Sequence, residues 1–234
     1  MRSPIIVALD YPTLEQALAC AKQLDPSVVR VKVGKQLYTS VGPAVLTVLH
    51  DLGFDVFLDL KFHDIPNTVA GAVGAAADLG VWMVNVHASG GRRMMEAAAE
   101  AVAKRGNKTQ LIAVTVLTSM DQDDLSELGI SETPADRVMR LATLAKSSGM
   151  DGVVCSAEEA TLLSRQFGSN FSLVTPGIRL PDDEVGDQRR VVTPWAAIDG
   201  GSTHLVMGRS ITGASSPSAV VDEVVARLAS SNSP

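Results

Sequence analysis

Short runs of β-branched and aliphatic residues alternate with longer segments of helical spacing along this 234-residue chain. The runs expected to be strands are Ile5–Asp10, Val28–Gly34, Val56–His63, Trp82–Ser89, Leu111–Thr118, Gly152–Ser156, Leu173–Ile178 and His204–Ser210. Helices are expected between them, near 13–23, 36–50, 67–79, 91–104, 134–149, 157–167, 194–199 and 217–229. Consecutive parallel strands need a long crossover, usually a helix, so this alternation predicts a parallel sheet.

The number and regularity of these units predict a closed sheet. Eight strand–helix units with right-handed crossovers are typical of a (β/α)8 TIM barrel folded as a single domain. An open doubly wound sheet is the main alternative, but no change of spacing marks a switch point in the strand order. No linker rich in Pro, Gly or Ser divides the chain. We therefore expect one barrel domain over residues 1–229 and a short polar tail over 230–234.

Charge and cysteine content exclude several kinds of partner. The formal net charge is −6 and the basic residues are scattered, which argues against nucleic acid as a partner. The two cysteines, Cys20 and Cys155, lie far apart without metal-ligand spacing and are expected to be free thiols.

The apolar run Ile5–Leu9 is too short for a signal peptide, and no run is long enough to span a membrane. We expect a soluble cytoplasmic protein that does not bind membranes.

Polar residues follow the predicted strands at the end where barrel enzymes build their sites. These residues are Asp10, Lys32, Asp59, Lys61, Thr118, Ser119, Arg179, Gly208 and Arg209. Because the carboxyl ends of all strands in a parallel barrel meet at one rim, we expect these side chains to converge there.

The densest signal is the segment from Leu58 to Thr68. Asp59 and Lys61 are two residues apart on a strand, so alternation predicts that they share the inner face of the barrel. A lone Asp-x-Lys would favour a structural ion pair. With Asp64 just beyond the strand, and Lys32 and Asp10 at the ends of the first two strands, a functional site becomes the better interpretation. Burying so many charges is costly unless they pair.

Four segments together resemble orotidine 5'-phosphate decarboxylases of the bacterial type. They are Val31–Gly34, Asp59–Thr68, Thr175–Arg179 and Gly208–Ser210, and the similarity extends from Asp10 to Ile211. The resemblance implies a homodimer without metal or cofactor. It also implies decarboxylation of orotidine 5'-phosphate to uridine 5'-phosphate, the last step of pyrimidine nucleotide synthesis.

The resemblance further implies which residues act at the reacting carbon. Lys61 would stabilise the carbanion at C6 and then protonate it. Asp59 would lie beside the substrate carboxylate, and together with Asp64 would keep Lys61 protonated. Lys32 would balance the second carboxylate and reach the ribose hydroxyls, which Asp10 would also bind.

The remaining parts of the substrate would be held by other strands and loops. Thr118 and Ser119 would hydrogen-bond the pyrimidine, and Pro176 would line the apolar side near C5. The resemblance also assigns phosphate binding to Gly208, Arg209 and Gln188, with Arg179 in support and residues 179–190 forming a lid. Asp64 and Thr68 would reach into the site of the partner subunit across a two-fold dimer.

Two alternative functions are weighed against this interpretation. Related barrels share the Asp-x-Lys-x-x-Asp pattern but hold a magnesium-bound enediolate of a sugar phosphate, which requires a carboxylate at the second strand. Lys32 stands there, and its positive charge would repel magnesium. A catalytically inactive nucleotide-binding barrel is the other alternative, but Asp59 and Lys61 are both present.

Overall fold

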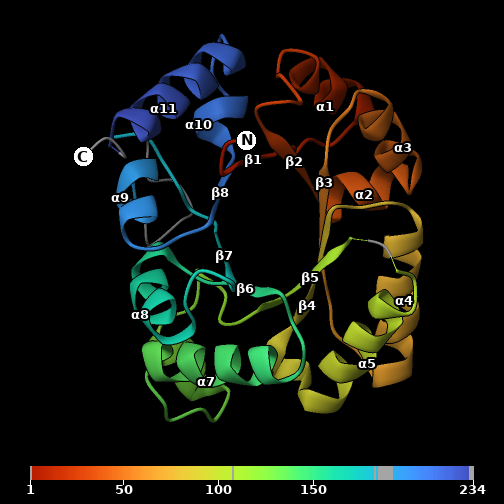
Figure 1. The fold of residues 1–234 in the computed structure, drawn as a ribbon, viewed down its shortest axis with the longest axis vertical. Helices are drawn as coiled ribbons and strands as arrows, with labels where there is room; N and C mark the ends of the chain where they lie inside the picture. The colour runs from red at the N-terminus through yellow and green to blue at the C-terminus, as the bar shows by residue number, and fades with distance from the viewer. Residues whose placement is uncertain (1, 107, 182, 184–191, 232–234) are drawn as a thin grey trace.

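The computed structural model describes residues 2–106, 108–181, 183 and 192–231, and its eight strands close into a parallel barrel (Figure 1). The strands are β1 Ile5–Ala8, β2 Arg30–Gly34, β3 Val56–Phe62, β4 Met83–His87, β5 Gln110–Val114, β6 Gly152–Val154, β7 Ser172–Thr175 and β8 His204–Met207. Each strand pairs with its neighbours in chain order, and β1 pairs with β8 to complete the ring. The predicted (β/α)8 barrel is therefore confirmed.

Helices surround the barrel on its outer face (Figure 1). They are α1 Leu14–Ala21, α2 Lys35–Val41, α3 Ala44–Asp51, α4 Pro66–Asp78, α5 Arg92–Ala103, α6 Gln122–Glu127, α7 Pro134–Ser147, α8 Ala157–Phe167, α9 Pro194–Asp199, α10 Arg209–Thr212 and α11 Pro217–Ser231, with a 3-10 turn η1 at Ala88–Gly90. Side-chain oxygens of Thr13 and Thr133 cap α1 and α7, and Pro66 opens α4. None of the described helices is long and apolar enough to cross a membrane.

The structure corrects several predicted element bounds. The single helix expected over 36–50 is two helices, because Gly42 takes a φ of +72° and Pro43 is the N-cap of the next helix. Helices α6 and α10 lie in segments expected to be loop or strand. Helix α11 continues to Ser231, so residues 230 and 231 of the expected polar tail are helical.

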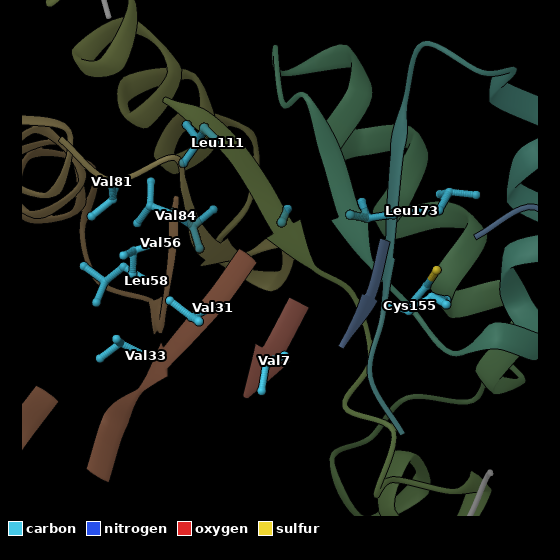
Figure 2. Close-up of a cluster of buried hydrophobic side chains, with 14 of the residues drawn as sticks. Val7, Val31, Val33, Val56, Leu58, Val81, Val84, Leu111, Cys155 and Leu173 are labelled. Atoms are coloured by element: carbon cyan, nitrogen blue, oxygen red, sulfur yellow. The ribbon is translucent and has the colours of Figure 1, made fainter. Parts of the chain in front are cut away.

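The core has an inner and an outer shell because the strands are buried on both faces. The inner shell fills the barrel and consists of Ile6, Ala8, Phe57, Met83, Ile112, Val174 and Val206. The outer shell joins strand residues, including Val7, Val31 and Leu58, to helix residues such as Leu46 and Val73. Figure 2 shows the strand side of this outer cluster. Neighbouring residues of one strand therefore contribute to different shells.

This alternation directs the charged side chains of β2 and β3 into the barrel. Lys32 lies between Val31 and Val33, which both belong to the outer shell. Asp59 follows Leu58 of the outer shell and is two residues from Phe57 of the inner shell. Lys32 and Asp59 therefore lie above the apolar filling of the barrel, toward the carboxyl ends of the strands.

Close packing of β6 against β7 generates a stability prediction. A Cβ atom at Gly152 would collide with the backbone carbonyl oxygen of Ser172 on β7. We expect Gly152→Ala to lower the free energy of unfolding by about 3 kcal/mol or more, because backbone atoms must move to relieve the overlap. The measurement is urea unfolding followed by circular dichroism.

Gly168→Ala is the matched control for this substitution. Gly168 has a φ of +73° at the end of α8, and a Cβ there would meet no atom within 4 Å. Only backbone strain of about 1 kcal/mol is expected at this site. A loss at Gly152 no larger than the loss at Gly168 would contradict the close approach of β6 and β7.

Candidate functional site

A cavity of about 440 Å³ opens at the carboxyl ends of the strands. Nine of the residues predicted for the site line this cavity. They are Asp10, Lys32, Asp59, Lys61, Thr118, Pro176, Arg179, Gly208 and Arg209. Apolar side chains such as Val114, Val154 and Val206 form much of the remaining wall. The cavity therefore combines a charged side with an apolar side, as is typical of a site for a small polar molecule.

Four charged side chains form a continuous row along the charged side. Lys32 Nζ lies 2.9 Å from Asp10 Oδ1 and 3.4 Å from Asp59 Oδ2. Lys61 Nζ lies 2.6 Å from Asp59 Oδ1. Positive and negative groups alternate along the row, so Asp59 is shared by two ammonium groups.

Burial and pairing act in opposite directions on the two most buried members of the row. Burial alone would raise the pKa of Asp59, but Lys32 and Lys61 outweigh it and hold that pKa below its ordinary value. Burial alone would lower the pKa of Lys32, but Asp59 and Asp10 outweigh it and raise that pKa above its ordinary value. Both groups are therefore charged at neutral pH.

Strand β3 departs from regular alternation at the residues that carry these charges. Leu58 pairs with Val84 of β4 and Phe62 pairs with Val86, so β3 contains two residues more than β4 over this stretch. Lys61 lies within the resulting bulge with a φ of +53°, the one positive φ among the described non-glycine residues. Simple alternation correctly predicted a shared face for Asp59 and Lys61 but did not predict this bulge.

Asn85 is a component of the site that the sequence interpretation missed. It lies in β4, fully buried, between Val84 and Val86 of the outer shell, so its side chain points into the barrel. Asn85 Nδ2 donates to Asp59 Oδ1 at 2.7 Å, and Asn85 Oδ1 accepts from the Lys61 backbone N–H at 2.8 Å. The sequence did contain a signal for this role: Asn85 is an amide between Val84 and Val86 in a predicted strand, and a buried amide needs hydrogen-bond partners.

The structure corrects the placement of Thr118 and Ser119. Strand β5 ends at Val114, so these two residues lie in a turn beyond the strand and do not end it. The apolar residues Val116 and Leu117 prolonged the strand-like pattern past the last paired residue. Thr118 lines the cavity, whereas Ser119 does not.

The side of the cavity near β7 and β8 carries two arginines. Arg179 is 7% exposed, and its buried Nε has no hydrogen-bond partner among the described residues. Arg209 begins α10 directly after Gly208, and both residues line the cavity. Gln188, with most of the expected lid, lies outside the described residues.

Asp64 and Thr68 lie outside the cavity of their own chain. Asp64 is exposed beyond β3, where its Oδ1 accepts from the backbone N–H of Ile65 at 2.6 Å, and Thr68 is exposed in the first turn of α4. Ile65 between them is 67% exposed and adds an apolar side chain to these two polar ones. These three residues therefore form an exposed strip beside the barrel mouth.

Histidines near the rim do not form a metal site in the described part of the chain. Within residues 2–106, 108–181, 183 and 192–231, no three or more His, Cys, Asp or Glu side chains are grouped to hold a metal ion. His63 and His87 have ring centroids 5.6 Å apart. Burial, followed by the charges of His63, Lys35 and Lys61, lowers the pKa of His87 to about 4. His87 is therefore neutral at neutral pH and adds no positive charge to that of the lysines and arginines that line the cavity.

Comparisons with known proteins give one consistent result. Residues 3–224 match the family described as Orotidine 5'-phosphate decarboxylase / HUMPS family. The orotidine 5'-phosphate decarboxylase of Alcanivorax borkumensis is 63% identical, over 97% of this chain and 98% of the relative, and that of a Marinomonas species is 64% identical over 97% of each. The crystal structure of orotidine 5'-phosphate decarboxylase from Lactobacillus acidophilus superposes with a TM-score of 0.86 at 39% identity, covering 96% of this chain and 98% of that chain.

The strained backbone of Lys61 generates a prediction that compares two substitutions at one position. Lys61→Ala and Lys61→Gly both remove the ammonium group, but only glycine adopts a φ near +53° without strain. We expect the glycine variant to be more stable than the alanine variant by about 1 kcal/mol. Urea unfolding of both variants measures the difference.

The same two substitutions at Leu60 serve as the control, because Leu60 lies in the same strand with an ordinary φ. At Leu60 the order should be reversed, since glycine costs about 0.5–1 kcal/mol relative to alanine within a strand. Finding alanine more stable than glycine at both positions would contradict a strained Lys61.

Proposed function

The chain belongs to the Orotidine 5'-phosphate decarboxylase / HUMPS family and converts orotidine 5'-phosphate to uridine 5'-phosphate and CO2, and we propose that Lys61 is its proton donor. The observation that carries the proposal is the 2.6 Å ion pair of Lys61 with Asp59 inside the cavity. This pair holds an ammonium group at a fixed position at the carboxyl end of β3. Asp59, Lys32 and Asp64 are proposed to act with Lys61.

The reaction leaves a negative charge that the protein must stabilise. When the bond between C6 and the carboxylate carbon breaks, CO2 departs and the electron pair remains on C6. A preorganised cation stabilises such a charge strongly in a site from which water is excluded. Lys61 then transfers a proton from Nζ to C6, which completes uridine 5'-phosphate, and solvent reprotonates the amine.

Asp59 is proposed to act on both Lys61 and the substrate. Its carboxylate orients the ammonium group of Lys61, and it is held anionic by the two lysines. Placed beside the carboxylate of the substrate, it would repel that group and favour the loss of CO2. Lys32 and Asp10, 2.9 Å apart, are proposed to bind the ribose hydroxyls.

The opposite side of the cavity is proposed to bind the base and the phosphate. Pro176 and the neighbouring valines would contact the pyrimidine face, and Thr118, which lines the cavity, would bind its polar edge. Ser119 follows Thr118 in the same turn and is proposed to bind this edge with it. Gly208 and Arg209 would bind the phosphate, supported by Arg179, whose buried Nε has no partner among the described residues. Gln188 is proposed to bridge phosphate and base when the segment 179–190 closes.

The magnesium-dependent sugar-phosphate alternative is disfavoured by Lys32. That chemistry needs a carboxylate at the end of the second strand to help bind the metal. Lys32 occupies this position and is paired with Asp10 and Asp59, so its positive charge would oppose a divalent cation there. The relatives from Alcanivorax borkumensis and Marinomonas, at 63% and 64% identity, are both orotidine 5'-phosphate decarboxylases.

Asp64 and Thr68 are proposed to complete the site of a second subunit in a homodimer. Both are exposed and lie outside the cavity of their own chain. Ile65, 67% exposed, gives the same strip an apolar contact surface. In a two-fold dimer the same residues are exchanged in both directions, so each site would receive Asp64 and Thr68 from its partner.

We also propose that the reaction takes place in the cytoplasm. Cys20 and Cys155 are both buried free thiols, which fits a reducing compartment. Neither cysteine has a role in the proposed chemistry.

The proposed reaction and the role of Lys61 are tested together by ultraviolet absorbance. We expect the wild-type protein to consume orotidine 5'-phosphate at an undiminished rate in EDTA. Lys61→Ala should lower kcat by at least about 10³-fold, because it removes both the stabilising charge and the proton. Lys104→Ala removes an exposed lysine paired with Glu100 on α5 and is the matched control, with unchanged activity.

Loss of substrate only after magnesium is restored would overturn the metal-free mechanism. Activity in Lys61→Ala equal to that of Lys104→Ala would overturn the role of Lys61 while leaving the overall reaction intact.

The shared site is tested by mixing two inactive variants. Lys61→Ala and Asp64→Ala are each expected to be inactive as homodimers. A dimer with one subunit of each type contains one site with both substitutions and one intact site. After subunit exchange at equal concentrations, about a quarter of the sites should be intact and activity should return accordingly. No return of activity in a mixture shown to exchange subunits would contradict the shared site.

A further inference from the structure

The bulge in β3 leaves Lys61 without a partner strand for its backbone. The pairing of β3 with β2 ends at Asp59, and its pairing with β4 passes from Leu58 directly to Phe62. A backbone N–H inside a protein must be satisfied by another acceptor. At Lys61 this acceptor is a side chain, Oδ1 of Asn85, at 2.8 Å.

Asn85 connects the strained backbone to the charged end of the same residue. Its Nδ2 donates at 2.7 Å to Asp59 Oδ1, the oxygen that also accepts from Lys61 Nζ at 2.6 Å. A closed ring of hydrogen bonds thus runs from the Lys61 backbone through Asn85 and Asp59 to the Lys61 ammonium group. Each member fixes the position of the next one.

The chemistry of the amide suits this location better than that of other polar side chains. One end of Asn85 must accept from an N–H and the other must donate to a carboxylate, which an amide does without carrying a charge. Reversing the amide would place its NH2 group against the Lys61 N–H and its oxygen against the carboxylate. Asn85 is fully buried, so water cannot replace either contact without entering the barrel.

Asn85 does not line the cavity, although it contacts two residues that do. Its influence on a bound substrate must therefore pass through Asp59 and Lys61. The pKa of Asp59 is lowered by Lys32 and Lys61 against the effect of burial, and the hydrogen bond from Asn85 acts in the same direction.

We propose that Asn85 is a positioning residue that holds Lys61 in its left-handed conformation and aligns its ammonium group, through Asp59, with the reacting carbon. This inference rests on the proposed role of Lys61 as proton donor. Since the ribose and phosphate would be bound by other residues, loss of Asn85 should impair the chemical step and leave binding of the nucleotide nearly unchanged. A displacement of about 1 Å between reacting groups is sufficient for a large loss of rate.

The first experiment uses Asn85→Ala in the purified full-length protein. We expect kcat to fall by about 10- to 100-fold, while KM and the dissociation constant of uridine 5'-phosphate change by less than about threefold. Thr109→Val is the matched control. Thr109 is buried and donates to the carbonyl of Val81 at 2.7 Å just before β5, at the opposite end of the barrel from the cavity. Its loss should leave kcat unchanged.

The second experiment uses Asn85→Asp, which keeps the shape of the side chain. The introduced carboxyl group can donate to Asp59 only when it is protonated, so it replaces the amide at low pH and repels Asp59 at high pH. The ratio of its kcat to that of the wild type should therefore fall as pH rises. Charged or titratable groups near this position are Asp10, Lys32, Asp59, Lys61 and His87, and taking the ratio to the wild type removes their shared contribution.

The outcomes separate this proposal from the proposed function. If the wild type is inactive or Lys61→Ala is fully active, the proposed function fails. If those results are as expected but Asn85→Ala keeps kcat within about threefold, or loses kcat and nucleotide binding equally, only the positioning role is overturned. Should Asn85→Ala fail to fold, Asn85→Asp decides. A ratio of its kcat to that of the wild type that falls as pH rises supports the proposal, and a ratio that does not change with pH overturns it.

Discussion

The pairing of one buried carboxylate with two lysines is the interaction on which the rest of the site depends. Asp59 is 9% exposed, and an unpaired carboxylate at such a position would be strongly destabilising. Lys32 and Lys61 form ion pairs with it, and Lys61 and the amide of Asn85 donate hydrogen bonds to it. Because Lys61 shares this carboxylate with Lys32, it is only partly neutralised, and its ammonium group lines the cavity before any substrate binds. Preorganised charge of this kind is what the formation of a carbanion requires.

The cost of this arrangement is visible in the backbone of β3. A regular strand pairs with its neighbour residue for residue, whereas β3 accommodates two extra residues against β4 and holds Lys61 at a positive φ. Such strain persists only where the surroundings stabilise it, and it is common at functional sites. Here the stabilisation comes from the closed eight-stranded ring and from apolar packing on both faces of the strands. The rigid barrel therefore supports a local conformation that the segment would not adopt alone.

Much of the fold and part of the site could be predicted from the sequence because they depend on local periodicity. Alternation along β2 and β3 was enough to direct Lys32 and Asp59 into the barrel, and the order of strands and helices was enough to predict closure. Strand ends were predicted less well where the apolar pattern of the sequence continues beyond the last residue that pairs with a neighbouring strand. Apolar residues after Val114 suggested that β5 extends to Thr118, but no neighbouring strand pairs with them. The Gly42–Pro43 break in the helix expected over 36–50 was also overlooked.

The sequence by itself determined the number of strand–helix units, the residues that face the barrel interior and the charge types gathered at one rim. Each of these follows from the spacing of residues along a single strand or helix. Only the tertiary structure decided that β3 bulges at Lys61, that Asn85 supplies the missing backbone partner, and that Thr118 lies in a turn beyond β5. The physical reason is that register between neighbouring strands is set by closure of the whole ring, so residues distant in sequence become partners only when the barrel is complete.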